Sequence, residues 1–199
     1  MYIKIGSKTI KISFLFAAFL VVCANFAGGK AVLLSFFFSF IHEIIHLVFL
    51  HFSGLKKAQI VLLPGAVKIY CEGLALLSYK KTALCTLSAP VFNMITGVVF
   101  SALFFVYPSE NMKICAAINF ILGAINFLPM EFLDGGRALR AILCVKTDEG
   151  RVHYIMKSLS LLSLIFLFAV FFMGCIMGKV QVFLLIFCVY CIIGSITDK

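Results

Sequence analysis

Apolar runs long enough to cross a lipid bilayer divide this chain, and they limit the folds that are open to it. We expect about six spans, near residues 10–27, 31–52, 82–107, 112–133, 158–178 and 180–196. Each run is close to the roughly 17–25 residues that an α-helix needs to cross the hydrocarbon core. Because 63% of the 199 residues are hydrophobic, a soluble domain of this length could not bury the apolar surface. The pattern predicts an all-α polytopic membrane protein, with a single domain over 1–199.

The basic residues predict how the spans are oriented. All but three of the 17 lysines and arginines fall in segments that share one side of the membrane if the N-terminus is cytoplasmic. The three exceptions are Lys30, Lys113 and Lys179. Basic residues concentrate in cytoplasmic loops, so we expect a multi-pass protein of the cell membrane with both termini in the cytoplasm. This placement also accounts for the net charge of +9 without a nucleic-acid partner.

Two segments on the predicted inner side are longer than simple turns. Residues 53–81 are too apolar for a solvated loop, and Pro64 and Gly65 interrupt them. Their short runs AQIVLL and AVKIYC are typical of paired strands, so we expect a short β-like segment near the membrane surface. Residues 134–157 alternate charged and apolar side chains, which predicts a helix lying in the membrane interface.

Three ionisable side chains lie within the apolar run 31–52. His42 and His46 are four residues apart, so on a helix they share one face and can bind one zinc ion. Glu43 lies beside them, where it can act as a base on water. Ionisable groups at membrane depth are energetically expensive, and three together indicate a functional site. The combination predicts hydrolysis inside a membrane.

A catalytic zinc site commonly has three protein ligands, so one more is needed. Glu131 and Asp134 both lie near the inner end of the fourth predicted span. Pro129 interrupts the helix just before them, and Gly135 with its neighbouring glycine allows a tight turn just after. A broken helix that ends in Asp-Gly-Gly is well suited to direct a carboxylate toward a metal ion.

Three separated motifs resemble those of the site-2 protease family of intramembrane zinc metalloproteases, peptidase family M50. They are HEIIH at 42–46, APVFN at 89–93 and NFLPMEFLDG at 126–135. Their order and wide spacing match the family, and the resemblance by motif covers roughly residues 30–140. Within the family the chain most resembles the six-span stage IV sporulation branch, which cleaves a membrane-tethered pro-sigma factor.

The chain also departs from the family pattern. Ala89 stands where glycine is usual, and Phe132 stands where a second proline is common. We find no PDZ insert, and the sequence to Lys199 has no CBS domain, so nucleotide regulation is not expected. Without a PDZ domain, selection of substrates is expected to depend on prior trimming or on a separate partner.

The resemblance implies a role for each motif residue. His42, His46 and Asp134 would bind one zinc ion, Glu43 would be the general base, and Asn93 would line the site and help to hold the substrate. The implied function is that of a zinc-dependent metalloendopeptidase. It would cleave membrane-anchored proteins near the cytoplasmic face in regulated intramembrane proteolysis, with pro-sigma or anti-sigma factors as candidate substrates.

The expected partners are the lipid bilayer, a membrane-anchored protein substrate and either a regulatory membrane protein or a second copy of the chain. The segment 53–81 would pair with the unwound substrate by addition of a strand. Two other functions stay open. A divalent-metal transporter would need ligands along a path to both faces, whereas the ligands found here are confined to the inner half. A catalytically inactive membrane scaffold would keep its function in Glu43→Gln.

Overall fold

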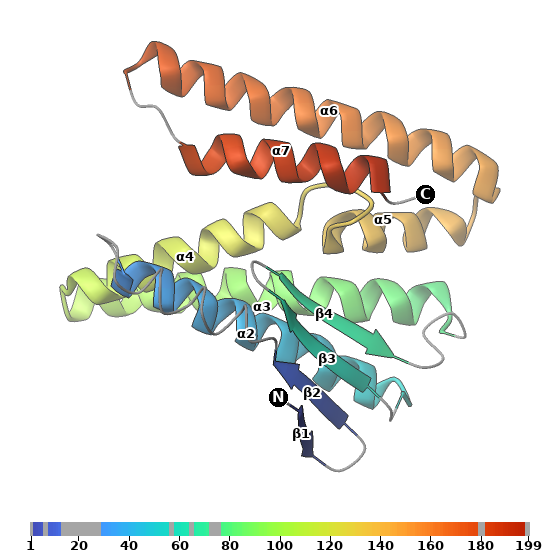
Figure 1. Cartoon of the computed structure of the whole chain (residues 1–199), viewed down its shortest axis with the longest axis horizontal. Helices are drawn as coiled ribbons and strands as arrows, with labels where there is room; N and C mark the ends of the chain where they lie inside the picture. The colour runs from blue at the N-terminus through green and yellow to red at the C-terminus, as the bar shows by residue number, and fades with distance from the viewer. Residues whose placement is uncertain are drawn as a thin grey trace. The chain divides into compact units, whose positions relative to one another are not determined.

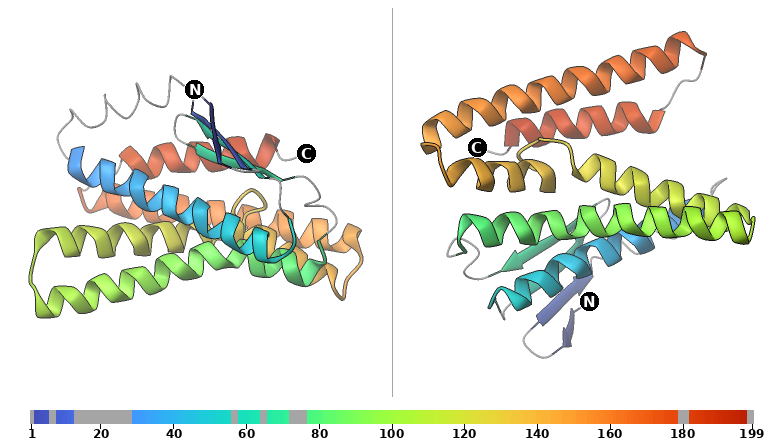
Figure 2. Two further views of the ribbon diagram at one scale, coloured as in Figure 1. Left: turned by 90° about the horizontal axis from the view of Figure 1, so that it is seen from below. Right: turned by 180° about the vertical axis from the view of Figure 1, so that it is seen from behind.

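The computed structural model describes residues 2–5, 8–12, 29–55, 58–63, 66–71, 77–178 and 182–197. In these residues the chain forms the strands β1 to β4 and the helices α2 to α7 (Figures 1 and 2). The contacts divide the chain into two compact units, Met1–Ala124 and Ile125–Lys199. The single domain expected over 1–199 stays a prediction.

Three helices make up most of the first unit: α2 (Gly29–Phe52), α3 (Tyr79–Val106) and α4 (Glu110–Asn126). Helices α2 and α3 pack against each other, and the rings of Phe38 and Phe100 meet edge to face with centroids 5.7 Å apart. Helix α4 contacts α3 through Phe120, whose ring lies over Gly97. Glycine at this position permits the close approach of the two helices, as is common between helices in membranes.

A four-stranded sheet completes the first unit, in the order β1-β2-β3-β4 (Figure 1). Its strands are β1 (Tyr2–Ile5), β2 (Lys8–Ile12), β3 (Ala58–Leu63) and β4 (Ala66–Cys71). Strands β3 and β4 coincide with the runs AQIVLL and AVKIYC, and they pair antiparallel with Leu62 opposite Val67. Strand β2 joins them in parallel, with Ile12 opposite Leu62, and β4 packs near α2.

Strand β2 corrects the start of the first predicted span, 10–27. Residues 10–12 belong to a strand, because the sequence KTIKI alternates polar and apolar side chains with the period of a strand. The rest of that predicted span, 13–28, lies outside the described residues.

The second unit contains α5 (Asp134–Cys144), α6 (Glu149–Ile176) and α7 (Val182–Thr197). Helix α6 packs against both α5 and α7. The buried core brings together side chains from the segment before α5 and from the last two helices: Met130, Leu133, Leu167, Cys188 and Cys191. This segment is therefore packed in the interior of its unit rather than lying on its surface.

Two predicted boundaries in this region are wrong. The span predicted at 112–133 ends early, because α4 stops at Asn126 and Pro129 cannot continue a helix without loss of a hydrogen bond. The interfacial helix predicted at 134–157 is two elements, since α5 ends at Cys144 and α6 begins at Glu149. Asp148 caps the second of these helices by accepting a hydrogen bond from the Gly150 N–H.

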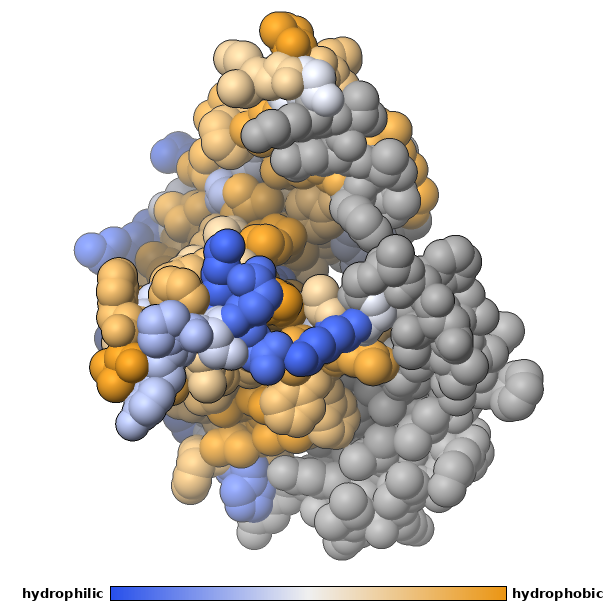
Figure 3. Space-filling model, turned by 90° about the vertical axis from the view of Figure 1, so that its left-hand side faces the viewer, coloured by the Kyte–Doolittle hydropathy of each residue, from blue (hydrophilic) through white to orange (hydrophobic). Residues whose placement is uncertain are grey.

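Among the described residues, α2, α3 and α6 are long and apolar enough to cross a membrane, with mean hydropathies of 2.0, 1.9 and 2.6. They coincide with the spans predicted at 31–52, 82–107 and 158–178. Large apolar side chains are exposed along them, including Phe105 and Ile176. In the view of Figure 3, apolar residues cover much of the coloured surface, with a group of hydrophilic residues among them. Such exposure is unfavourable in water and favourable in lipid. The chain is a multi-pass membrane protein, and the side on which its termini lie stays a prediction.

Candidate metal centre

Helix α2 places His42 and His46 one turn apart on its buried face. The ring centroids are 4.9 Å apart and the ring planes are nearly perpendicular, at 87°. Both side chains are buried, although the helix is otherwise apolar enough for lipid. Glu43 follows His42 on the same helix and is half-buried. The spacing that predicted a shared helix face for the two imidazoles is thus present in the structure.

A main-chain carbonyl on α3 fixes the orientation of His46. The Nδ1 atom of His46 lies 2.9 Å from the carbonyl oxygen of Cys85. A carbonyl oxygen can only accept, so Nδ1 must carry the proton and the ring lone pair lies on Nε2. The same oxygen accepts a second hydrogen bond from the Ser88 hydroxyl at 2.7 Å.

His42 is held by a side chain instead. Its Nδ1 lies 2.6 Å from Oδ1 of Asn93, which is 1% exposed. The amide nitrogen of Asn93 in turn donates to Oδ1 of Asn119 on α4, at 2.9 Å. Asn93 was singled out from the sequence, whereas Asn119 was not. The available signal was its position four residues after Cys115 and four before Gly123, on the buried face of α4.

Asp134 is the first residue of α5, where a negative charge is stabilised by the helix dipole. The two glycines that follow it are buried against main-chain atoms of the preceding segment, near Phe127 and Met130. This packing leaves the segment before α5 little freedom, so the position of the carboxylate on its own helix is well determined. Glu131, the other acidic candidate, pairs with Arg140 at 3.3 Å.

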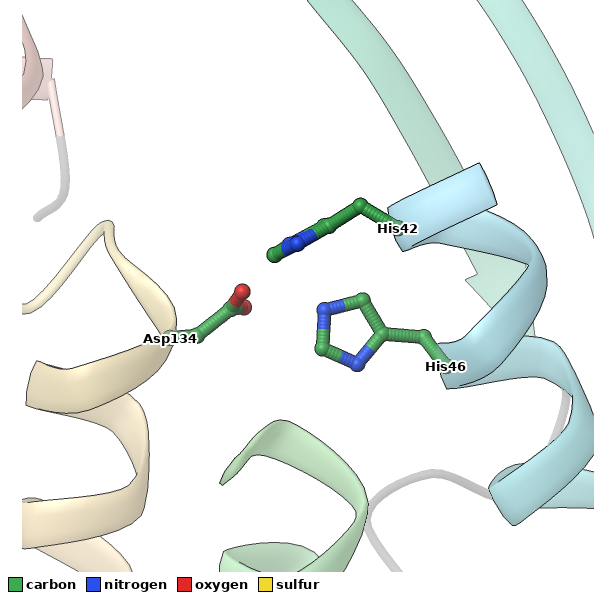
Figure 4. Close-up of side chains that lie close together, drawn as sticks. All are labelled: His42, His46 and Asp134. Carbon is green, nitrogen blue, oxygen red and sulfur yellow. The ribbon is translucent and has the colours of Figure 1, made fainter. Parts of the chain in front are cut away.

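His42, His46 and Asp134 are the one group of possible metal ligands found among the described residues. Their candidate ligand atoms are ring nitrogens of the two histidines and a carboxylate oxygen of the aspartate, and Figure 4 shows the three side chains. Two imidazoles that carry lone pairs on Nε2, together with one carboxylate, form a donor set that zinc commonly binds in catalytic sites. These residues therefore fit one zinc ion.

Comparison with known proteins shows which family model and which solved structure the chain resembles. Residues 74–168 match the model of Peptidase family M50, a region that includes Asn93, Asn119 and Asp134. No curated protein shows significant similarity to the chain. Among solved structures, a site-2 protease from Methanocaldococcus jannaschii has a similar fold. The likeness covers 100% of this chain and 94% of that chain, with a TM-score of 0.68 and 23% sequence identity. The chain thus combines a region that matches the model of Peptidase family M50 with a His-His-Asp group whose donors suit one zinc ion.

Proposed function

We infer that this chain, whose residues 74–168 match the model of Peptidase family M50, is an intramembrane zinc metalloendopeptidase. The observation that carries the inference is the pair His42 and His46, buried on a helix that is apolar enough to cross a membrane. Each imidazole is hydrogen-bonded through Nδ1 to an acceptor of the protein, as metal-binding histidines almost always are. We assign Asp134 as the third ligand on the donor set described above.

A zinc ion held by these ligands would supply a Lewis acid that polarises a peptide carbonyl and makes water more acidic. We assign Glu43 as the general base, which takes a proton from the attacking water and passes it to the leaving amine. Asn93 is proposed to contact the substrate. Its Nδ2 has two hydrogens, and one of them is used by Asn119, so the second can donate to a substrate carbonyl.

The proposed substrates are membrane-anchored proteins, cleaved near the cytoplasmic face after local unwinding of the backbone. Membrane-tethered pro-sigma and anti-sigma factors are the candidates that follow from the resemblance of the motifs. Strand order supports a more specific place for pairing with the unwound peptide. Because β3 is paired on both sides, strand addition within 53–81 can occur on β4, which is an outer strand of the described sheet.

Two proline variants test the role of β4. Consecutive N–H groups point to opposite sides of a strand, so Val67→Pro and Lys68→Pro remove donors from opposite sides. One variant weakens the pairing with β3, and the other removes a donor on the outer side. We expect the variant that keeps the stability of the wild type to lose cleavage while it retains zinc. Unchanged cleavage in both variants would contradict a role of the strand.

The activity itself is tested with wild type and Glu43→Gln, each purified in detergent and incubated with a single-span test substrate. Zinc content is measured in both proteins by mass spectrometry. We expect zinc in both and cleavage by the wild type alone, because Glu43 is not a ligand. Glu110→Gln is the matched control, since Glu110 is an exposed residue at the start of α4, and it should cleave like the wild type.

The remaining outcomes of these assays distinguish the proposed function from its alternatives. If the wild type binds zinc but cleaves no member of a panel that includes pro-sigma and anti-sigma factors, a metal-binding scaffold is the better description. Uptake of zinc into vesicles that contain the protein would identify a transporter. A wild-type protein without zinc affinity would contradict the proposed function.

A further inference from the structure

We propose that Asn119 is a positioning residue which, through Asn93, fixes the tautomer of His42 and directs its Nε2 lone pair to the metal. The inference rests on the proposed function, because it concerns the same zinc site. It is carried by a chain of hydrogen bonds that connects three helices of the first unit. His42 belongs to α2, Asn93 to α3 and Asn119 to α4.

The donor and the acceptor in each of these hydrogen bonds can be assigned by starting from Asn119. The Nδ2 of Asn119 lies 2.9 Å from the carbonyl oxygen of Cys115, which can only accept. Asn119 must therefore present its Oδ1 to Asn93, and Asn93 must answer with its Nδ2. The remaining end of the Asn93 amide is Oδ1, and it faces Nδ1 of His42. His42 is thus the donor, so its neutral ring carries the proton on Nδ1 and the lone pair on Nε2.

The burial of both asparagines makes these hydrogen bonds necessary for the orientation of His42. Asn119 is 0% exposed and Asn93 is 1% exposed, so bulk water does not replace a missing partner. If the Asn93 amide turned over, its Nδ2 would face Nδ1 of His42. The imidazole would then have to accept, and its proton would move to Nε2, the atom that should bind the metal. Asn119 prevents this, because it presents its Oδ1 to Asn93 and its Nδ2 is used by the Cys115 carbonyl. Asn93 must therefore keep its own Nδ2 on that side.

The orientation of His46 does not depend on a side-chain amide. His46 donates to the main-chain carbonyl of Cys85, which cannot exchange its oxygen for a donor. A side-chain amide can turn over, whereas a peptide carbonyl inside a helix is fixed by its neighbours. The two ligands are therefore oriented by different means, and a change at Asn119 should affect His42 alone.

The test uses three variants and a control, each assayed for zinc affinity by competition with a chromogenic chelator. Asn119→Leu removes the acceptor, and we expect zinc affinity to fall about 10- to 100-fold. Asn93→Asp keeps an acceptor for His42 whichever way the side chain turns, because both carboxylate oxygens accept, but it also sets one of them against Oδ1 of Asn119 and serves only as the background for the double variant. In N93D/N119L that opposing acceptor is gone and the acceptor for His42 no longer depends on orientation, so zinc affinity should be at least that of N93D and well above that of N119L. Asn111→Leu, an exposed asparagine on the same helix, is the matched control.

Cobalt substitution provides a spectroscopic readout that a loss of packing alone would not produce. Loss of the His42 ligand should change the visible absorption of the Co²⁺ protein in N119L and should leave it unchanged in N93D/N119L. Should N119L not purify as a folded protein, Asn119→Ser replaces it, because a hydroxyl is too short to reach both partners.

Unchanged zinc affinity in N119L would overturn the inference, and so would a double variant as weak as N119L. In the second case the loss comes from packing rather than from orientation of the amide. These results leave the proposed function standing, because the wild type still binds zinc and cleaves. A wild-type protein that binds no zinc overturns the proposed function and this inference together.

Discussion

The main-chain carbonyl of Met130 occupies the space that a side chain on Gly136 would need. Asp134 begins α5 two residues earlier, so the same turn that brings these backbones together also positions the proposed third ligand. A carbonyl group within a packed segment cannot move aside as the tip of a flexible side chain can. The Asp-Gly-Gly sequence is thus explained by close packing of the backbone.

Gly136→Ala should therefore destabilise the protein by at least about 1–3 kcal/mol, the usual cost of overpacking, and lower its zinc content. Unfolding can be followed with a thiol-reactive dye, because Cys188 and Cys191 are buried in this unit. Gly150→Ala is the matched control, since its new Cβ would meet only the Asp148 carboxylate, at 3.1 Å. Equal unfolding temperatures for the two variants would contradict this account of the turn.

Contact between α3 and α4 depends on Gly97 and Phe120. A Cβ on Gly97 would lie 2.9 Å from the Phe120 ring. Gly97→Ala should therefore be destabilising by about 1–3 kcal/mol, and Phe120→Leu in the same protein should recover part of the loss by making room. A double-mutant cycle measured by thermal unfolding should give a coupling of about 0.5–3 kcal/mol. Additive effects would show that the two residues do not press on each other.

The ion pair between Glu131 and Arg140 should contribute little to stability. Its atoms are 3.3 Å apart, but the Arg140 side chain is 49% exposed. Solvent screening limits such a pair to about 0.2–1 kcal/mol. Arg140→Ala and Glu131→Gln should each shift the unfolding temperature only slightly, and the shift should shrink further in high salt. A large effect of Glu131→Gln on zinc content would instead indicate that Glu131 has a role at the metal site.

Removal of zinc should lower stability as well as abolish cleavage, because a ligand that binds only the folded state stabilises it. At zinc concentrations about 100 times the dissociation constant this amounts to about 2.7 kcal/mol, or about 5–10 °C in unfolding temperature for a chain of this size. Glu43→Gln should respond to a chelator as the wild type does, and His46→Ala should not respond. A chelator shift retained in His46→Ala would contradict the proposed ligand set.

Local sequence was sufficient for features that depend on neighbouring residues. The apolar runs predicted the long helices α2, α3 and α6, and AQIVLL and AVKIYC coincide with β3 and β4. Boundaries were less accurate where one composition permits two structures. The start of the first predicted span is a strand, because residues 8–12 pair with residues far along the chain. The fourth predicted span extended past Asn126, because the sequence stays hydrophobic beyond the end of α4. Pro129 prevents the helix from continuing there.

The sequence by itself determined that His42 and His46 share a helix face, because four residues are about one turn of any α-helix. It also determined that this helix is apolar enough to lie in a membrane. Only the tertiary structure decided what holds the two rings. Asn93 is 51 positions from His42, and Asn119 is a further 26 positions away. Hydrogen bonds over such separations depend on how α2, α3 and α4 pack, which the spacing of residues along a single helix does not contain.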